Sequence, residues 1–298
     1  MDFHTFLIQL LNGVQYGLLL FLVASGLTLV FGIMGIINVA HGSFYMVGAY
    51  FAWWLTGKLG SFWLALPAGI ALSVAIGMLL EWLLIRHLYR RDHLYQVLLT
   101  YGLILVFEEL RSVLWGDDVR GIGLPDLLNA SIPLTDTQSY PVYRLWISAV
   151  CLVVAGLMYW VIQKTRLGMM VRAGASNREM VQTLGIDIGM VYRVVFALGV
   201  TLAALAGMIA APVSSAFPGM GNQVLIICFV VVVIGGMGSV KGALVAAILI
   251  GLVDTFGKVL TLEIGGMRVL PELSSMTVYL LMAVILLWRP EGLFGRKL

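Results

Sequence analysis

Charge is the property that this sequence lacks most. Only 11% of its 298 residues are charged and 61% are hydrophobic, against about 25% and about 45–50% in soluble domains. Residues 3–57 and residues 194–240 contain no Asp, Glu, Lys or Arg. Each run exceeds the roughly 20 residues of one membrane helix, so it crosses a bilayer about twice, or once with a re-entrant piece. The scarcity of charge therefore excludes a soluble fold and predicts a polytopic helical membrane protein.

Cysteines and catalytic motifs are scarce as well. Cys151 and Cys228 both lie in apolar runs without C-x-x-C spacing, which argues against a disulfide framework or a zinc site. The four histidines lack the spacing of metal ligands, and neither H-E-x-x-H nor G-x-S-x-G occurs. The phosphate-binding pattern G-x-x-x-x-G-K-[ST] is absent too. We therefore expect no enzyme activity and no metal, cofactor or ATP bound by this chain.

Apolar runs divide the chain into eight or nine transmembrane or re-entrant segments. They predict an all-α fold in which residues 1–298 form a single transmembrane domain. The nine candidate segments are residues 5–31, 43–57, 61–85, 95–115, 143–163, 190–212, 222–237, 242–258 and 273–289.

The basic residues give this topology an orientation. If nine segments alternate, twelve of the 18 Lys and Arg residues fall on one side of the bilayer and six on the other. Basic residues that flank membrane spans stay on the cytoplasmic side. We therefore expect the N-terminus outside and the C-terminus in the cytoplasm. This distribution also accounts for the net charge of +3, so we expect no nucleic-acid partner.

Two connections are long enough to carry a function. Residues 116–142 contain four aspartates and three prolines and are predicted to form an extracytoplasmic loop, which is either a solvated connection or a functional cap. Residues 164–189 are predicted to face the cytoplasm. Ser176 or Asn177 can cap a short amphipathic helix over residues 178–184. Periodicity leaves two interpretations open for this helix, which either lies on the membrane surface or presents a protrusion to a partner.

Two glycine-rich breaks interrupt the apolar segments. The first, within residues 26–44, contains Asn38 and His41 among four glycines. A broken helix of this kind can line a solute pathway. Alternatively, its glycines allow close helix packing while the polar side chains bond to nearby backbone. The second break spans residues 235–242, and its place late in the chain predicts an inverted repeat in which it mirrors the first.

Few charged residues lie inside the apolar segments. Glu108 and Arg111 are three positions apart, so they can form an ion pair on one helix face with a structural or gating role. Asp254 stands in an otherwise apolar segment. It either lines a polar space or bonds to a neighbouring helix, and we favour the second interpretation.

Several motifs together resemble those of a known family. They are G-L-T-L-V-F-G-I-M-G-I-I-N-V-A-H-G-S-F at 26–44, T-R-L-G-M-M-V-R-A at 165–173, N-R-E-M-V-Q-T-L-G-I at 177–186, G-G-M-G-S-V-K-G-A at 235–243 and R-P-E-G-L-F-G at 289–295. The chain resembles the branched-chain amino-acid permeases of ATP-binding-cassette (ABC) transporters, in their shorter subtype.

The resemblance implies a membrane-spanning subunit of an importer in the bacterial inner membrane. Its partners would be a second homologous permease, two cytoplasmic ATPases that bind the ATP, and an extracytoplasmic solute-binding protein. The solute would be a branched-chain amino acid or a related small molecule. The alternatives are a permease of the same family for urea, short amides or aromatic acids, and an ATP-independent secondary transporter or channel.

The resemblance also assigns roles to residues. Those similar to the ATPase-coupling loop of the family are Arg172, Ala173, Asn177, Met180, Leu184, Gly185 and Ile186. Those in the two breaks become candidates for the pathway or gate, namely Asn38, His41, Gly42, Gly235, Gly236 and Gly238.

Overall fold

The computed structural model describes residues 3–89, 91–135, 138–176, 178–259, 263–264, 267–268 and 272–295. Within these residues the chain forms nine helices of at least 16 residues, which confirms the all-α polytopic fold. Each predicted apolar segment matches one of these helices to within three residues at either end. The nine are α1 (Phe3–Met34), α2 (His41–Leu59), α3 (Phe62–Leu83), α4 (His93–Trp115), α5 (Val142–Lys164), α8 (Ile188–Ser214), α9 (Met220–Gly235), α10 (Val240–Val259) and α11 (Glu272–Trp288).

Shorter elements connect the long helices. They are the helices α6 (Arg166–Ser176) and α7 (Arg178–Thr183), the 3-10 turns η1 (Ile85–Leu88) and η2 (Asp126–Leu128), and the strands β1 (Ser131–Thr135), β2 (Gln138–Pro141), β3 (Glu263–Ile264) and β4 (Met267–Arg268). The strands pair as two antiparallel hairpins, β1 with β2 and β3 with β4. The hairpin β1–β2 lies inside the loop 116–142, in which no strands were expected.

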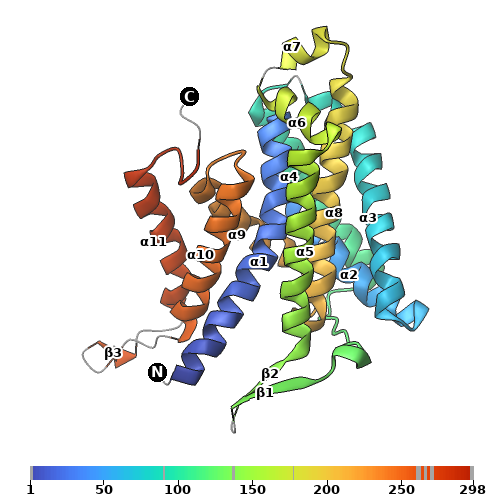
Figure 1. Cartoon of the computed structure of the whole chain (residues 1–298). Helices are drawn as coiled ribbons and strands as arrows, with labels where there is room; N and C mark the ends of the chain where they lie inside the picture. Colours follow the sequence, from blue (N-terminus) through green and yellow to red (C-terminus); the bar gives the residue numbers. More distant parts are fainter. Residues whose placement is uncertain are drawn as a thin grey trace.

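The long helices run between two ends of one bundle (Figure 1). The hairpin β1–β2 and the start of α1 lie at one end, whereas α6, α7 and the residues after α11 lie at the other. The two predicted functional connections are thus at opposite ends. Five helices of the described chain are long and apolar enough to cross a membrane, namely α1 from His4, α3, α5, α8 and α10. How many of the nine cross the bilayer stays a prediction, as does the sidedness of the two ends.

Helices α1 and α8 form the centre of the bundle, and small residues allow their close packing. A Cβ atom on Gly17 would lie 2.7 Å from the carbonyl oxygen of Ala247 in α10, and one on Gly26 would lie 2.9 Å from that of Gly199 in α8. Helices in a bilayer associate through such close backbone approaches, because lipid tails compete with apolar side chains. Most residues of α1 and α8 are therefore buried by protein, whereas most residues of α3 and α5 are at least partly accessible.

The first half of the chain has a counterpart in the second half, although a different one from that predicted. The order α1, extended residues 35–40, α2 and α3 is matched by α8, residues 215–219, α9 and α10. Helices α1 and α8 run in opposite directions (Figure 1), as an inverted repeat requires. The break at 35–40 thus corresponds to 215–219. Residues 236–239 form a tight turn between α9 and α10, in the place that residues 60–61 occupy between α2 and α3.

The starts of α2 and α9 touch each other through two glycines of these corresponding helices. A Cβ atom on Gly221 would lie 2.7 Å from the carbonyl oxygen of Gly42, and a Cβ atom on Gly42 would overlap that of Gly221. Backbone therefore meets backbone at this point, and no side chain fits between the two helices.

This contact predicts different effects for two Gly→Ala substitutions. Gly42→Ala should lower the stability of the purified protein by about 1–3 kcal/mol, because the added methyl group forces α2 and α9 apart. Gly102→Ala is the matched control, since nothing lies within 4 Å of its added carbon and alanine favours a helix over glycine. Thermal unfolding in detergent measures both. Equal melting temperatures for the two variants would contradict the close contact.

Candidate functional site

The extended segment between α1 and α2 is held by side chains of α4. Gly35 ends α1 with a φ of +65°, a conformation that glycine adopts without strain. The N–H of Ile37 donates to Oε1 of Gln96 at 3.4 Å, and that of Val39 donates to Oγ1 of Thr100 at 3.3 Å. Backbone polar groups at membrane depth require partners from the protein. Helix α4 supplies them for this segment.

Gln96 and Thr100 were not predicted as functional residues. Both are buried, and their spacing of four positions places them on one face of α4. Leu98 and Leu105 of the same helix are exposed. Two polar residues one turn apart in a mostly apolar helix are the sequence pattern from which they could have been predicted.

Asn38 and His41 both bond to neighbouring backbone. The Asn38 Oδ1 accepts the N–H of Ala40 at 3.1 Å, and His41 Nε2 lies 3.1 Å from the carbonyl oxygen of Val23. A carbonyl accepts, so this nitrogen of His41 carries the proton. Both side chains are fully buried. These contacts are those of the packing interpretation, and a role of either residue in a gate stays a prediction.

The second glycine-rich break meets the first one and the end of the chain. A Cβ atom on Gly32 would lie 2.8 Å from the Cα of Gly238. Leu293 and Phe294 donate their N–H groups to the last two carbonyl oxygens of α9, at 2.8 and 3.1 Å. Gly236 passes between these parts with a φ of +96°. Three of the sequence motifs, 26–44, 235–243 and 289–295, thus converge at one end of the bundle.

The connection between α5 and α8 protrudes from this same end. The helix predicted over 178–184 is present as α7, whereas α6 was not predicted. Val171 and Val181 are buried, while Met180 and Leu184 are 61% and 71% exposed. Figure 1 shows α7 projecting beyond the ends of the long helices. Both interpretations of this helix, a position on the membrane surface and a protrusion presented to a partner, stay predictions.

The other coupling-loop candidates surround α7. Ala173 is exposed, Ile186 is half-buried, and Gly185 has a φ of +82° with its N–H bonded to Gln182. Arg172 donates to the carbonyl oxygen of Ile162 in α5. Asn177 lies outside the described residues.

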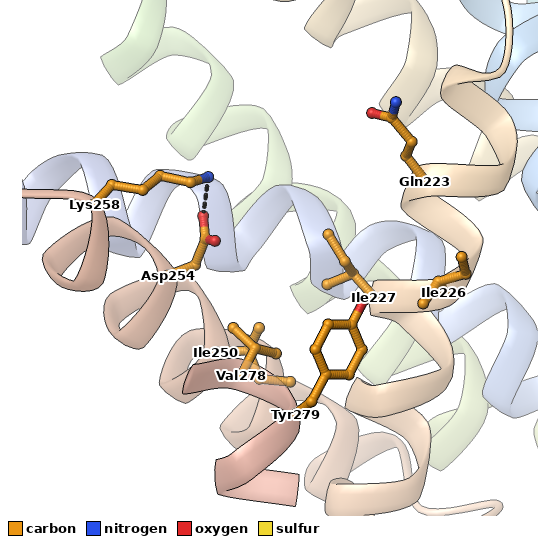
Figure 2. Close-up of a pocket in the computed structure, with 8 residues that line it drawn as sticks. All are labelled: Gln223, Ile226, Ile227, Ile250, Asp254, Lys258, Val278 and Tyr279. Atoms are coloured by element: carbon orange, nitrogen blue, oxygen red, sulfur yellow. Dashed lines mark hydrogen bonds and ion pairs between the residues drawn. The ribbon is translucent and has the colours of Figure 1, made fainter. Parts of the chain in front are cut away.

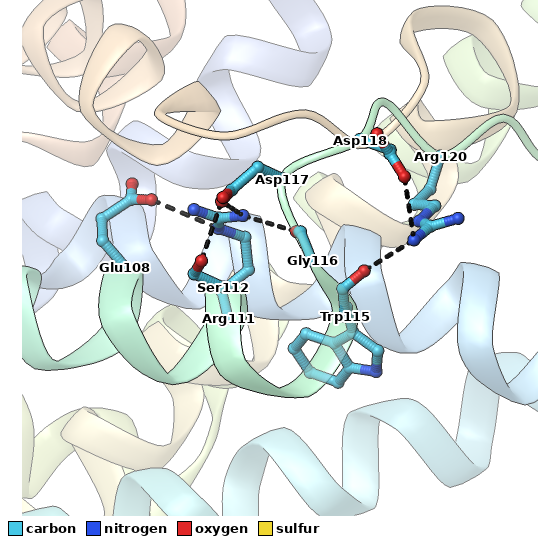
Figure 3. A network of polar contacts seen from close by, with 8 residues as sticks. All are labelled: Glu108, Arg111, Ser112, Trp115, Gly116, Asp117, Asp118 and Arg120. Atoms are coloured by element: carbon cyan, nitrogen blue, oxygen red, sulfur yellow. Dashed lines mark hydrogen bonds and ion pairs between the residues drawn. The ribbon is translucent and has the colours of Figure 1, made fainter.

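Arg111 organises the opposite end of the bundle (Figure 3). Its Nε lies 3.4 Å from Glu108, the expected partner, and its Nη1 lies 2.8 Å from Asp117 and 2.7 Å from the carbonyl oxygen of Gly116. Hydrogen bonds from Arg111 and then Ser112 hold the pKa of the exposed Asp117 below its usual range. Arg111 therefore fastens the start of the loop 116–142 to α4, through a contact that spacing within one helix could not show.

Arg120 continues this network to the second half of the protein. Its backbone exchanges hydrogen bonds of 2.7 and 2.8 Å with Ala216, just before α9. Its side chain donates to the carbonyl oxygen of Trp115 at 2.8 Å, lies 3.5 Å from Asp118 and stacks over Trp53. The loop is thus fastened to both α2 and the segment that precedes α9.

Two cavities lie on either side of a single ion pair. Lys258 Nζ is 2.6 Å from Asp254 Oδ2, one turn apart on α10. We call the larger space, of about 430 Å³ between α1, α5, α8 and α10, the polar cavity. The smaller space, of about 240 Å³ between α9, α10 and α11, is the aliphatic cavity (Figure 2). The polar cavity is lined by Gln9, Asn12, Gln15, Tyr16, Leu19, Tyr45, Arg144, Ile147, Ala210, Val213, Ser214, Asp254, Thr255, Lys258 and Val259.

These cavities revise the expectations from sequence. Asp254 lines both spaces and bonds within its own helix, so the favoured interpretation, a bond to a neighbouring helix, was wrong. None of the six pathway candidates from the glycine-rich breaks lines either cavity. Among the described residues no cluster of His, Cys, Asp and Glu could hold a metal ion.

A comparison with known families identifies the chain. The family model described as "Branched-chain amino acid transport system / permease component" matches residues 9–286. The chain belongs to this family. The permease BraD of Pseudomonas aeruginosa is 28% identical, over 99% of this permease and 97% of BraD. The permease LivH of Escherichia coli is 27% identical with the same coverage.

The longer permeases of the family are matched less completely. LivM of Escherichia coli is 28% identical over 90% of this permease but only 66% of LivM. This permease is therefore of the shorter, LivH-like subtype and is a multi-pass membrane protein. Among solved structures, PsaBC from Streptococcus pneumoniae aligns over 98% of this permease and 95% of that chain, with a TM-score of 0.47 and 13% identity.

The contacts of Gln96 predict a loss of stability in Gln96→Leu. This change leaves the N–H of Ile37 and the carbonyl oxygen of Arg91 without the Gln96 side chain, whereas the carbonyl oxygen of Leu88 keeps the N–H of Arg91. Each unsatisfied buried group costs about 1–3 kcal/mol. Thermal unfolding should show the loss, and Gln163→Leu, at an exposed position of α5, should not. A Gln96→Leu variant as stable as wild type would show that α4 does not hold the break.

Proposed function

We propose that this permease is the membrane-spanning subunit of an ABC importer for branched-chain amino acids or closely related solutes. The near full-length similarity to LivH and BraD carries the proposal, because both are high-affinity branched-chain amino acid transport system permease proteins. A space lined by Arg144, Asp254 and Lys258 between apolar helices supports it, since charged side chains within membrane segments are costly and characteristic of solute pathways.

The proposed importer contains further subunits. A second, homologous permease completes the pathway, two cytoplasmic ATPases bind and hydrolyse ATP, and an extracytoplasmic binding protein delivers the solute. This chain binds no cofactor itself. Its N-terminus faces outward and its C-terminus lies in the cytoplasm, in agreement with the excess of Lys and Arg at that end. The protrusion around α7 then meets an ATPase, and the loop 116–142 meets the binding protein.

Helix α8 transmits motion from the protrusion to the core. Asp187 caps α8 by accepting the N–H groups of Gly189 and Met190, and the N–H of Ile186 bonds back to Val181 in α7. The connection from α7 to α8 is therefore short and tightly bonded. Helix α8 also packs against α1 and α2 in the centre of the bundle. Displacement of α7 by a closing ATPase pair would move α8, and with it the walls of the polar cavity.

The glycine-rich breaks contribute to this motion as gate elements. Asn38, His41 and Gly42 lie where α2 begins, and Gly235, Gly236 and Gly238 form the end of α9 and the turn to α10. Both places connect a short central helix to a neighbour, so they can absorb a change in helix angle.

Reconstitution tests the proposed function directly. Proteoliposomes that carry both permeases, the ATPases in the lumen and the binding protein outside should accumulate L-leucine only when ATP is enclosed in the lumen. Vesicles with this chain alone should accumulate nothing. Accumulation by this chain alone under an ion gradient would establish a secondary transporter instead. A panel with urea, acetamide and benzoate distinguishes the other solutes of such permeases.

The exposed leucine of the protrusion predicts a loss of ATPase docking. Leu184→Glu places a charge on an apolar side chain that is 71% exposed and should reduce co-purification of the ATPase at least tenfold. Leu127→Glu is the matched control, because that leucine is 79% exposed at the opposite end. Membrane insertion should be normal in both. Co-purification of wild-type amounts of ATPase with the Leu184→Glu variant would show that Leu184 has no role in docking.

A further inference from the structure

The ion pair between the two cavities is only partly enclosed. The Asp254 side chain is 12% exposed and that of Lys258 is 56% exposed. The carboxylate is therefore held in the protein, while the long ammonium arm can move. Arg144, a second cation on the wall of the polar cavity, already bonds to Asn12 at 2.6 Å.

The two cavities beside the pair are lined by different kinds of side chain. In the aliphatic cavity, branched side chains of three helices face one space, and Gln223 and Tyr279 complete the wall (Figure 2). The branched residues are Ile226, Ile227, Ile250 and Val278. The polar cavity presents amide, hydroxyl and guanidinium groups beside apolar side chains such as Leu19, Ile147 and Val213. Opposite charges thus stand beside a space that fits a small branched hydrocarbon group.

We propose that Asp254 and Lys258 bind the charged end of a zwitterionic amino acid inside the permease, with its branched side chain in the aliphatic cavity. The solute ammonium group pairs with Asp254, and the solute carboxylate pairs with Lys258. One ion pair is thereby exchanged for two, so neither charge is left without a partner. The inference rests on the proposed transport function and adds a solute site in this chain, where the family comparison assigns none.

A purely structural role explains the pair less well. A cation near the end of α10 is favourable because the C-terminus of a helix is negative, so Lys258 needs no aspartate. A carboxylate inside the bundle costs free energy that an apolar residue would avoid. A zwitterionic solute, by contrast, requires a negative and a positive side chain close together, as Asp254 and Lys258 are. The ethanolamine headgroup of a phospholipid shares that chemistry, so a test must separate it from the amino acid.

A direct binding experiment distinguishes the amino acid from the phospholipid headgroup as the ligand. The assembled permeases and ATPases, without the binding protein, are placed in phosphatidylglycerol nanodiscs, and saturation-transfer NMR follows L-leucine. We expect a leucine signal that 4-methylpentanoate and isoamylamine, which each lack one charge, do not give. The signal should disappear in Asp254→Asn. Absence of the leucine signal, or its loss when phosphatidylethanolamine is mixed into the discs, would overturn the proposal.

Single and double substitutions of Asp254 and Lys258 distinguish a role in solute binding from a structural role. In the reconstituted importer, Asp254→Asn and Lys258→Gln should each raise the leucine concentration for half-maximal uptake by about tenfold to a hundredfold, because each removes a charged hydrogen-bond partner. The double variant should be at least as impaired. Recovery of uptake in the double variant would assign the pair a structural role, since removing both partners relieves an unpaired charge. Glu109→Gln, at an exposed position of α4, is the control.

Filling the aliphatic cavity tests where the side chain lies. Ile226 is 50% exposed, so Ile226→Trp can enter the cavity without disrupting the core. It should lower uptake of leucine at least tenfold more than uptake of alanine, whereas Leu105→Trp on α4 should change neither. An unchanged ratio would overturn the placement. If the wild-type importer takes up no amino acid, the proposed function fails; if it does and the variants match it, only this inference fails.

Discussion

A peptide group inside a bilayer has no water to bond, so every interruption of a helix must bring its own partners. This constraint explains the arrangement around the central helices. Gln96 and Thr100 of α4 accept hydrogen bonds from the backbone of the segment before α2. The backbone of Arg120 exchanges hydrogen bonds with the segment before α9. The N–H groups of residues 293–294 donate to the carbonyl oxygens at the end of α9. Breaks that look like isolated glycine motifs in the sequence therefore fix the positions of elements far away in the chain.

The membrane segments could be predicted from sequence because their signal is local. Runs of apolar residues bounded by charge gave the nine long helices to within three residues. The helix α7 could be found for the same reason, from a capping residue and a short apolar period. The ion pair of Asp254 and Lys258 was also present as an i, i+4 spacing, but the charge of Lys258 was assigned to topology alone.

The remaining features depend on contacts between distant segments. The pairing of Arg111 with Asp117 and of Arg120 with Ala216 arises from the path of a loop. The counterpart of the first break is 215–219, whose Pro218-Gly219 indicates a turn but does not show that it corresponds to a break in the other half of the chain. Similarly, the polar cavity is bounded by helices from both halves of the chain. No periodicity within one helix predicts which neighbour leaves a space beside it.

The contact between Gly42 and Gly221 has a mechanical consequence. Where two helices meet through side chains, the side chains of one helix pack into the grooves between those of the other. Any change in their relative position then requires several rotamers to change. At the starts of α2 and α9 the two backbones touch, and the Cβ atoms of Leu225 and Met46, one turn further along, are the next side-chain atoms. A small rotation of one helix against the other about this point requires few rotamers to change, so the crossing can act as a pivot for α2 and α9.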